Sequence, residues 1–118
     1  MIAERVKSLL PPEIQAITTI GELPTDSDCC VALTDAGGKH AMYFSRNRMD
    51  TPLLKVSVRD IDFFRGFTNI KTCKDVLTGH ADAQTLGIVL INDILYLGRD
   101  AKRRNQWQLT FKIYSDIK

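Results

Sequence analysis

The chain has 118 residues, 44% of them hydrophobic and 25% charged, and its formal net charge at neutral pH is +2. These values are typical of a globular protein, and they favour one domain over residues 1–118 with a single core instead of a disordered or repetitive chain. No run approaches the roughly 20 apolar residues that a membrane helix needs, and so small a net charge does not by itself indicate a nucleic-acid-binding protein.

The first predicted element is a short amphipathic helix at the amino terminus. Apolar residues recur at helical spacing over residues 2–10, and the Pro11–Pro12 pair ends the pattern because a proline ring does not fit inside a continuing helix. Acidic and basic residues interrupt this apolar pattern, unlike in a signal peptide, so we expect synthesis in the cytoplasm. Residues 14–23 are apolar in patches and predict a weak strand before the turn-forming stretch "LPTDSD".

The next predicted strand covers Cys29 to Thr34. Its residues are apolar on both faces, which is typical of a central strand, and the Gly37–Gly38 pair is expected to end it. The three cysteines of the chain are Cys29, Cys30 and Cys73. Their number is odd and no CxxC spacing is present, so we expect reduced, mostly buried thiols with no metal or redox role.

The segment Lys39 to Asp50, "KHAMYFSRNRMD", is rich in polar and charged residues, and we interpret it as a partly extended stretch or a mobile loop. The stretch "TPLLKVSVRD" that follows is clearer. Leu54, Val56 and Val58 alternate there with polar residues, which predicts a strand buried on one face.

After Asp60 the apolar period changes from two residues to three or four, which predicts the main amphipathic helix. The apolar stripe consists of Phe63, Phe67, Ile70, Cys73 and Leu77. Asp60 is the expected N-cap, and Gly79 lies where a helix often ends in a left-handed residue. Phe64 lies off the stripe and is a candidate interface residue, although single exposed aromatic residues are common.

The remaining residues predict further strands. At Asn92 and Asp93 no favoured hairpin turn is present, so the strand there is expected to be bent or bulged instead of reversed. The last strand alternates strictly, and its apolar face consists of Trp107, Leu109, Phe111 and Ile113. Together these elements predict an α+β fold, in which an N-terminal helix and one main helix cover one face of a mostly antiparallel sheet of four to five strands.

The sequence offers no evident active site. His40 and His80 lie in expected loops, and neither has another possible metal ligand at helical spacing from it. No catalytic-nucleophile, phosphate-loop or dinucleotide-binding motif is present. The paired carboxylates, Asp26 with Asp28 and Asp60 with Asp62, are explained by turn and capping roles. We therefore expect no enzyme activity, no cofactor and no metal site.

A basic turn at residues 99–105 is the most distinctive polar feature. Phosphates could be held there, with two further arginines adding charge across the sheet edge; a solvated hairpin tip and a protein contact are the alternatives. The cations concerned are Arg46, Arg48, Arg99, Lys102, Arg103 and Arg104.

Three segments in this order resemble one known family. They are "LPTDSDCCVALTDAGG", then "TPLLKVSVRD" followed by the amphipathic helix, then "ILYLGRDAKRRNQWQLTFKIY". Over residues 23–114 the chain resembles the minor capsid or tail terminator proteins of long-tailed bacteriophages and prophages. Two departures from the family pattern are the segment Lys39 to Asp50 and the second cysteine at Cys30.

The resemblance implies a structural virion protein of the tail and neck region, assembled in the host cytoplasm. Such a protein caps the finished tail tube as a homo-oligomeric, hexameric ring and presents the surface that joins the head connector. Its partners would be further copies of itself, the tail tube protein and the connector proteins, with non-specific DNA proximity in the channel and no membrane.

Under this interpretation the turn Arg99 to Asn105 and the loop Lys39 to Asp50 contact neighbouring subunits. Phe64, Met42 and Tyr43 are the candidate apolar anchors. Two other functions stay open: a small nucleic-acid-binding module that uses the basic turn at residues 99–105, and, more distantly, an enzyme whose site is assembled from scattered residues.

Overall fold

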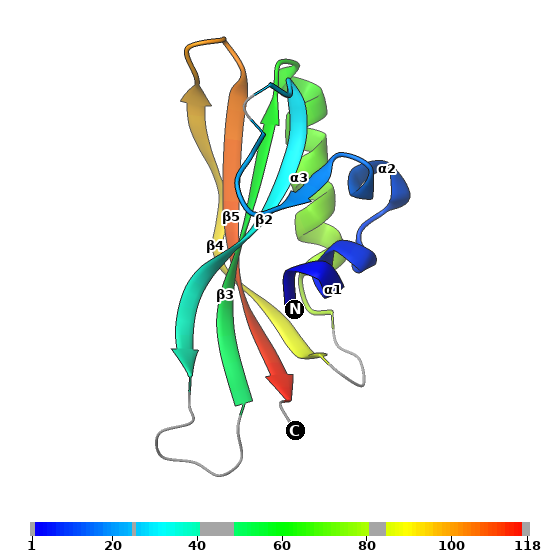
Figure 1. Cartoon of the computed structure of the whole chain (residues 1–118), viewed down its shortest axis with the longest axis vertical. Helices are drawn as coiled ribbons and strands as arrows, with labels where there is room; N and C mark the ends of the chain where they lie inside the picture. The colour runs from blue at the N-terminus through cyan, green and yellow to red at the C-terminus, as the bar shows by residue number, and fades with distance from the viewer. Residues whose placement is uncertain (1, 25, 41–48, 81–84, 117–118) are drawn as a thin grey trace.

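The computed structural model describes residues 2–24, 26–40, 49–80 and 85–116, and Figure 1 shows a long twisted sheet with the helices gathered on one side. The elements in chain order are α1 (Ile2–Leu9), α2 (Pro12–Gln15), β1 (Thr18–Ile20), β2 (Cys29–His40), β3 (Met49–Asp60), α3 (Phe63–Leu77), β4 (Thr85–Arg99) and β5 (Asn105–Asp116). This α+β arrangement, with one main helix on one face of a mostly antiparallel sheet, confirms the predicted fold class.

The described residues form a five-stranded sheet in the order β1-β2-β3-β5-β4. β1 pairs with β2 in parallel, and the other three pairings are antiparallel. β2 lies between β1 and β3 over residues 31–33, as its apolar character on both faces predicts. The two edges differ greatly in length, since β1 has three residues and β4 has fifteen.

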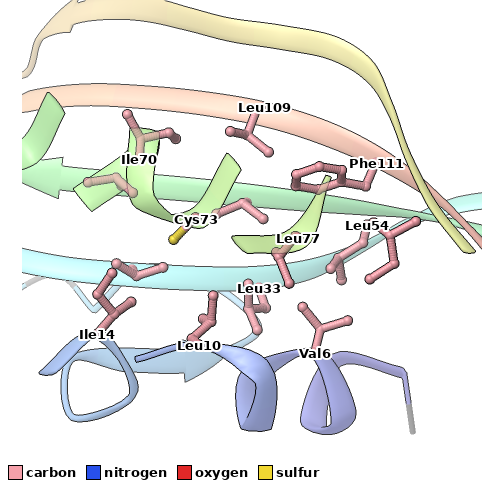
Figure 2. Close-up of a cluster of buried hydrophobic side chains, with 14 of the residues drawn as sticks. Val6, Leu10, Ile14, Leu33, Leu54, Ile70, Cys73, Leu77, Leu109 and Phe111 are labelled. Atoms are coloured by element: carbon pink, nitrogen blue, oxygen red, sulfur yellow. The ribbon is translucent and has the colours of Figure 1, made fainter. Parts of the chain in front are cut away.

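The core lies between the sheet and the helices, as Figure 2 shows for side chains that converge from both. The predicted alternation in β5 is confirmed: its apolar set is at most 1% exposed, and the intervening side chains at Gln108, Thr110 and Lys112 are only partly buried. The buried apolar residues of this set and of β3 are Leu54, Val56, Val58, Trp107, Leu109, Phe111 and Ile113.

The amino-terminal helix and the weak strand after it are confirmed. α1 ends before Pro11, and Val6 and Leu10 of this region pack into the core. The second, one-turn helix α2 was not expected from the sequence. It begins at Pro12, where a proline is tolerated because the first helical N–H groups have no partner within the helix.

One prediction about the strand β2 is wrong. Gly37 and Gly38 do not end β2, which runs on to His40; a register irregularity between Asp35 and Gly38 accommodates them within the ladder. The segment Lys39 to Asp50, which was expected to be partly extended or a mobile loop, is extended at both ends, because its first two residues end β2 and its last two begin β3. Residues 41–48, with Arg46 and Arg48, lie outside the described residues.

β4 passes through Asn92 and Asp93 as one strand and does not reverse there. Its pairing with β5 is irregular on both sides of Asn92, between Leu90 and Leu95, so the predicted bulge is confirmed. An extra residue opposite a regular partner bends and twists the strand, which explains why no turn is needed.

The predicted main helix is confirmed, with one correction at its start. Asp60 is not the N-cap: it ends β3, and Asp62 caps α3 by accepting hydrogen bonds from the backbone N–H groups of Phe64 and Arg65. The spacing of two acidic residues did not distinguish these roles. Gly79 follows the C-terminal end with φ of 77°, as expected for a left-handed residue there.

The apolar stripe of α3 divides into two halves. Ile70, Cys73 and Leu77 are fully buried against the sheet, whereas Phe63 and Phe67 are 43% and 40% exposed. No helix among the described residues is long and apolar enough to cross a membrane.

Candidate interaction surface

The basic turn between β4 and β5 is organised by a single carboxylate, that of Asp100. Its Oδ1 atom accepts hydrogen bonds from the backbone N–H groups of Lys102 (2.9 Å) and Arg104 (3.0 Å). The backbone N–H of Arg103 donates to the Asp100 carbonyl at 3.0 Å, and Arg103 takes a left-handed conformation with φ of 61°. The hydrogen bonds from Arg104, that of its backbone N–H foremost, and from the backbone of Lys102 hold the pKa of the Asp100 carboxyl below its usual value.

Arg104 points back into its own chain instead of into solvent. Its Nε donates to Asp100 Oδ2 at 2.8 Å and its Nη1 donates to the carbonyl of Ser27 at 3.0 Å, with Asp28 Oδ1 at 3.8 Å. Only 6% of its side chain is exposed. Arg104 therefore ties the turn to the segment before β2.

The other three cations of the turn, Arg99, Lys102 and Arg103, are exposed. The structure thus brings three of the predicted contact residues together at one end of the sheet and separates Arg104 from them in role. Whether Arg46 and Arg48 join this group lies outside the described residues.

An ion pair with one buried partner lies at the junction of β3 and α3. Arg65 donates to both carboxylate oxygens of Asp60, from Nε at 2.7 Å and from Nη2 at 2.8 Å, and the backbone N–H of Asp62 donates at 2.8 Å. The Asp60 side chain is fully buried, whereas that of Arg65 is 52% exposed. Asn105 donates to the Asp60 carbonyl at 3.2 Å and accepts from the Tyr96 hydroxyl at 2.7 Å, which links the pair to β4 and β5.

Burial raises the pKa of Asp60, but the hydrogen bonds from Arg65 and from the backbone of Asp62 outweigh it, so the pKa lies below its usual value of 3.8. A lowered folded-state pKa means that the unfolded chain binds the proton more readily. The ionised Asp60 side chain therefore contributes its full stabilisation above the pKa that Asp60 has in the unfolded chain. This contribution is lost as the pH falls through the pKa of Asp60 in the folded chain.

We expect the wild-type chain to have a larger free energy of unfolding than the variant Asp60→Asn. This difference should be constant near neutral pH and should shrink as the pH falls below about 4. Urea denaturation of both chains at a series of pH values measures this. A difference that stays constant down to pH values where the wild-type carboxylate is protonated would contradict the assignment.

The three thiols are poor nucleophiles where they lie. Burial, followed by the hydrogen bond to Asp60, raises the pKa of Cys29 to about 11, and burial raises the pKa of Cys73 to about 12. Burial also raises the pKa of Cys30. At neutral pH the reactive thiolate form is accordingly scarce.

Four aromatic rings gather where the start of α3 meets β4 and β5. Phe63 packs edge-on against Trp107 (5.2 Å between ring centroids), Tyr96 (5.5 Å) and Phe64 (5.8 Å), and Tyr96 lies 5.3 Å from Trp107. Trp107 is buried, but Phe64 is 79% exposed. The cluster thus extends continuously from Trp107 in the core to Phe64 at the surface.

A second apolar group follows β4 along the edge of the sheet. Val89 opposes Lys112 and Leu95 opposes Gln108, so both lie on the sheet face away from α3. Ile91 and Leu97 occupy the irregular positions of the strand. All four side chains are between 46% and 52% exposed.

The described residues show little that is typical of a catalytic site. They contain no group of three His, Cys, Asp or Glu side chains arranged for a metal ion. A hollow of about 360 Å³ lies beside the irregular part of β4, lined by residues 91–95 and 108–110. Its one charged lining residue, Asp93, already binds Lys74 Nζ at 2.9 Å. His80 lies away from this hollow, where its backbone N–H donates to Leu77 after α3.

A scan of protein-family models and a search of curated proteins give no match. Among solved structures, one matching chain belongs to a particle described as the virion of a native gene transfer agent. The TM-score is 0.64 and the identity is 12%, over 95% of this chain and 84% of that chain. At this identity the likeness establishes the fold that the two chains share.

The exposed apolar group on β4 was not expected from the sequence. Its signal was present, since apolar residues occupy successive positions on both sides of Asn92 and Asp93. Such a run is typical of a strand buried on both faces, and only the strand order shows that β4 is at an edge. The position of Phe64, in contrast, was correctly expected to lie off the buried stripe.

Proposed function

We propose that the chain is a structural virion protein that caps the end of a phage tail tube as a homo-oligomeric ring and joins it to the head connector. The observation that carries this proposal is the fold shared with a chain of a gene transfer agent virion, which extends over 95% of this chain. The ordered resemblance of three sequence segments to phage tail terminators supports the more specific role.

The surface supports an assembly role. An enzyme site usually has a pocket in which polar side chains converge on the substrate. The described residues instead have exposed aromatic and aliphatic side chains along the β4 edge of the sheet, as protein–protein interfaces do. The partners would be further copies of this chain, the tail tube protein and the connector proteins. Exposed cations at Arg99, Lys102 and Arg103 would set the specificity and rate of such contacts more than their affinity.

We expect purified protein, added to tail tubes that lack their terminator, to appear in electron micrographs as a closed ring on the tube ends. Light scattering of the protein alone, over a wide concentration range, shows whether the ring forms before the tube is met. Bare tube ends at every concentration would contradict the proposal. An unrelated protein of similar size and charge serves as the control for non-specific deposition.

The nucleic-acid-binding alternative rests on the same three exposed cations of the basic turn. Binding to phosphates releases counterions and therefore weakens steeply as salt rises, whereas an apolar ring contact does not. Bare tube ends together with DNA retention that is lost between low and high salt would favour this alternative.

A further inference from the structure

Exposed apolar side chains lie along the edge strand β4, and others lie beside this strand on α3. The helical positions 63, 67 and 74 share one face, and two of them contact β4: Phe63 packs on Tyr96, and Lys74 binds Asp93. Phe67 therefore also faces this edge. We call the following eight side chains, each 40–79% exposed, the apolar edge: Phe63, Phe64, Phe67, Val89, Ile91, Leu95, Tyr96 and Leu97.

Few charged side chains protect the apolar edge from contact with another chain. Charged side chains, lysine above all, blunt exposed edges in natural proteins. From Val89 to Leu97 the strand has one charged residue, Asp93, and Lys74 of α3 binds it at 2.9 Å. The bulge around Asn92 interrupts the row of backbone N–H and C=O groups along the edge of β4. A partner would therefore bind through side chains and not through a continuous ladder of backbone hydrogen bonds.

The exposed area is close to what a specific interface needs. Half-exposed aliphatic and aromatic side chains offer roughly 80–100 Å² each, so the eight together offer about 700 Å². This area is divided between the α3 side of the sheet, where Phe63 and Tyr96 lie, and the opposite side, where Val89 and Leu95 lie, so a neighbour must wrap around the edge strand to cover all of it. A standard protein–protein interface buries about 800 Å² on each partner, and its centre is enriched in aromatic residues. The phenylalanines and Tyr96 supply such a centre on the α3 side, and Gln108 and Lys112, which oppose Leu95 and Val89, supply polar neighbours on the other side.

We propose that the apolar edge is the surface through which one copy of this chain contacts a second copy. The choice of occupant rests on the proposed function, since a ring of identical subunits requires each copy to bury a sizeable surface against its neighbour. The small net charge of +2 adds little repulsion between copies. In a ring this contact is head-to-tail, with the apolar edge meeting a different surface of the next subunit.

The test is the variant Phe64→Lys with Leu95→Lys, which places one charge on each flank of β4. Both side chains are more than half exposed, so the fold is expected to persist, and circular dichroism verifies this. Sedimentation velocity over a wide concentration range is expected to show association of the wild type and about tenfold or greater weakening in the variant. Glu13→Lys on α2 is the control, because Glu13 is exposed and the change adds the same net charge of +2.

If the folded double variant associates as strongly as the wild type, the inference is overturned. It is also overturned if the wild-type chain is monomeric both in solution and on tube ends. The result is separable from the proposed function. Rings on tube ends formed equally by the double variant would leave the capping function intact and reject the apolar edge. Self-association through the apolar edge, with tube ends left bare, would support the contact and reject the cap.

Discussion

Replacing Gly66 with alanine is expected to lower the free energy of unfolding by about 3 kcal/mol. A Cβ atom at this position would lie 2.3 Å from Cζ3 of Trp107 and 2.8 Å from Cβ of Asp60. The indole cannot move aside easily, because it is 1% exposed and packs on Phe63 and Tyr96. The gain of about 1 kcal/mol in helix propensity from glycine to alanine only partly offsets this strain.

Urea denaturation followed by tryptophan fluorescence measures the effect, and Trp107 is the only tryptophan of the chain, so the signal comes from the contact itself. Gly87→Ala is the matched control, since a Cβ at Gly87 meets nothing within 4 Å. Its stability is expected to stay close to that of the wild type. Equal stability of the two variants would show that α3 does not depend on the close approach at Gly66.

Much of the fold was predictable because it depends on local periodicity. The alternation of Trp107 and Phe111 with polar residues and the helical spacing of Ile70 and Cys73 each require one buried face, whatever the rest of the chain does. The bulge at Asn92 was also predictable, because the Asn92–Asp93 pair is not a favoured two-residue hairpin turn. These signals lie within a few residues of the structure that they specify.

The errors concern features that tertiary pairing decides. A glycine pair ends a strand only where the ladder has no means to accommodate it, and the pairing of β2 with β3 provides an irregularity there. Asp60 and Asp62 look alike in sequence, and only the end of β3 and the position of Arg65 separate a buried ion-pair partner from a helix cap. Local propensity carries no information on either choice.

The candidate surface was predictable only in part for the same reason. The basic turn was recognised, but the inward direction of Arg104 depends on Ser27, which lies 77 residues away in sequence. The exposure of Leu95 depends on the place of β4 at the edge of the sheet. Charge and apolarity are visible in a sequence, whereas the neighbour that satisfies or exposes them is not.

Asp60→Ala is expected to cost about 3 kcal/mol of stability, at the lower end of the range for breaking a buried ion pair. The reason for the lower end is that the Arg65 side chain is half exposed and can be solvated when it loses its partner. The substitution also leaves the backbone N–H of Asp62 without its acceptor at the start of α3. Asp93→Ala, which removes the carboxylate of an exposed pair, is the control and is expected to cost far less.

A double-mutant cycle separates the pair from its surroundings. Arg65→Ala alone leaves the fully buried Asp60 carboxylate without its two strongest donors, and we expect it to be strongly destabilising as well. With Asp60→Ala in the same chain, the loss should be clearly smaller than the sum of the single losses, because no charge is then left buried. Additivity of the two changes to within about 0.5 kcal/mol would mean that the two side chains act independently. The Asp60–Arg65 pair joins β3 to α3, and the first turn of α3 carries Phe63 and Phe64. The same cycle, repeated on the association of the chain, would therefore show whether this ion pair positions the aromatic half of the apolar edge.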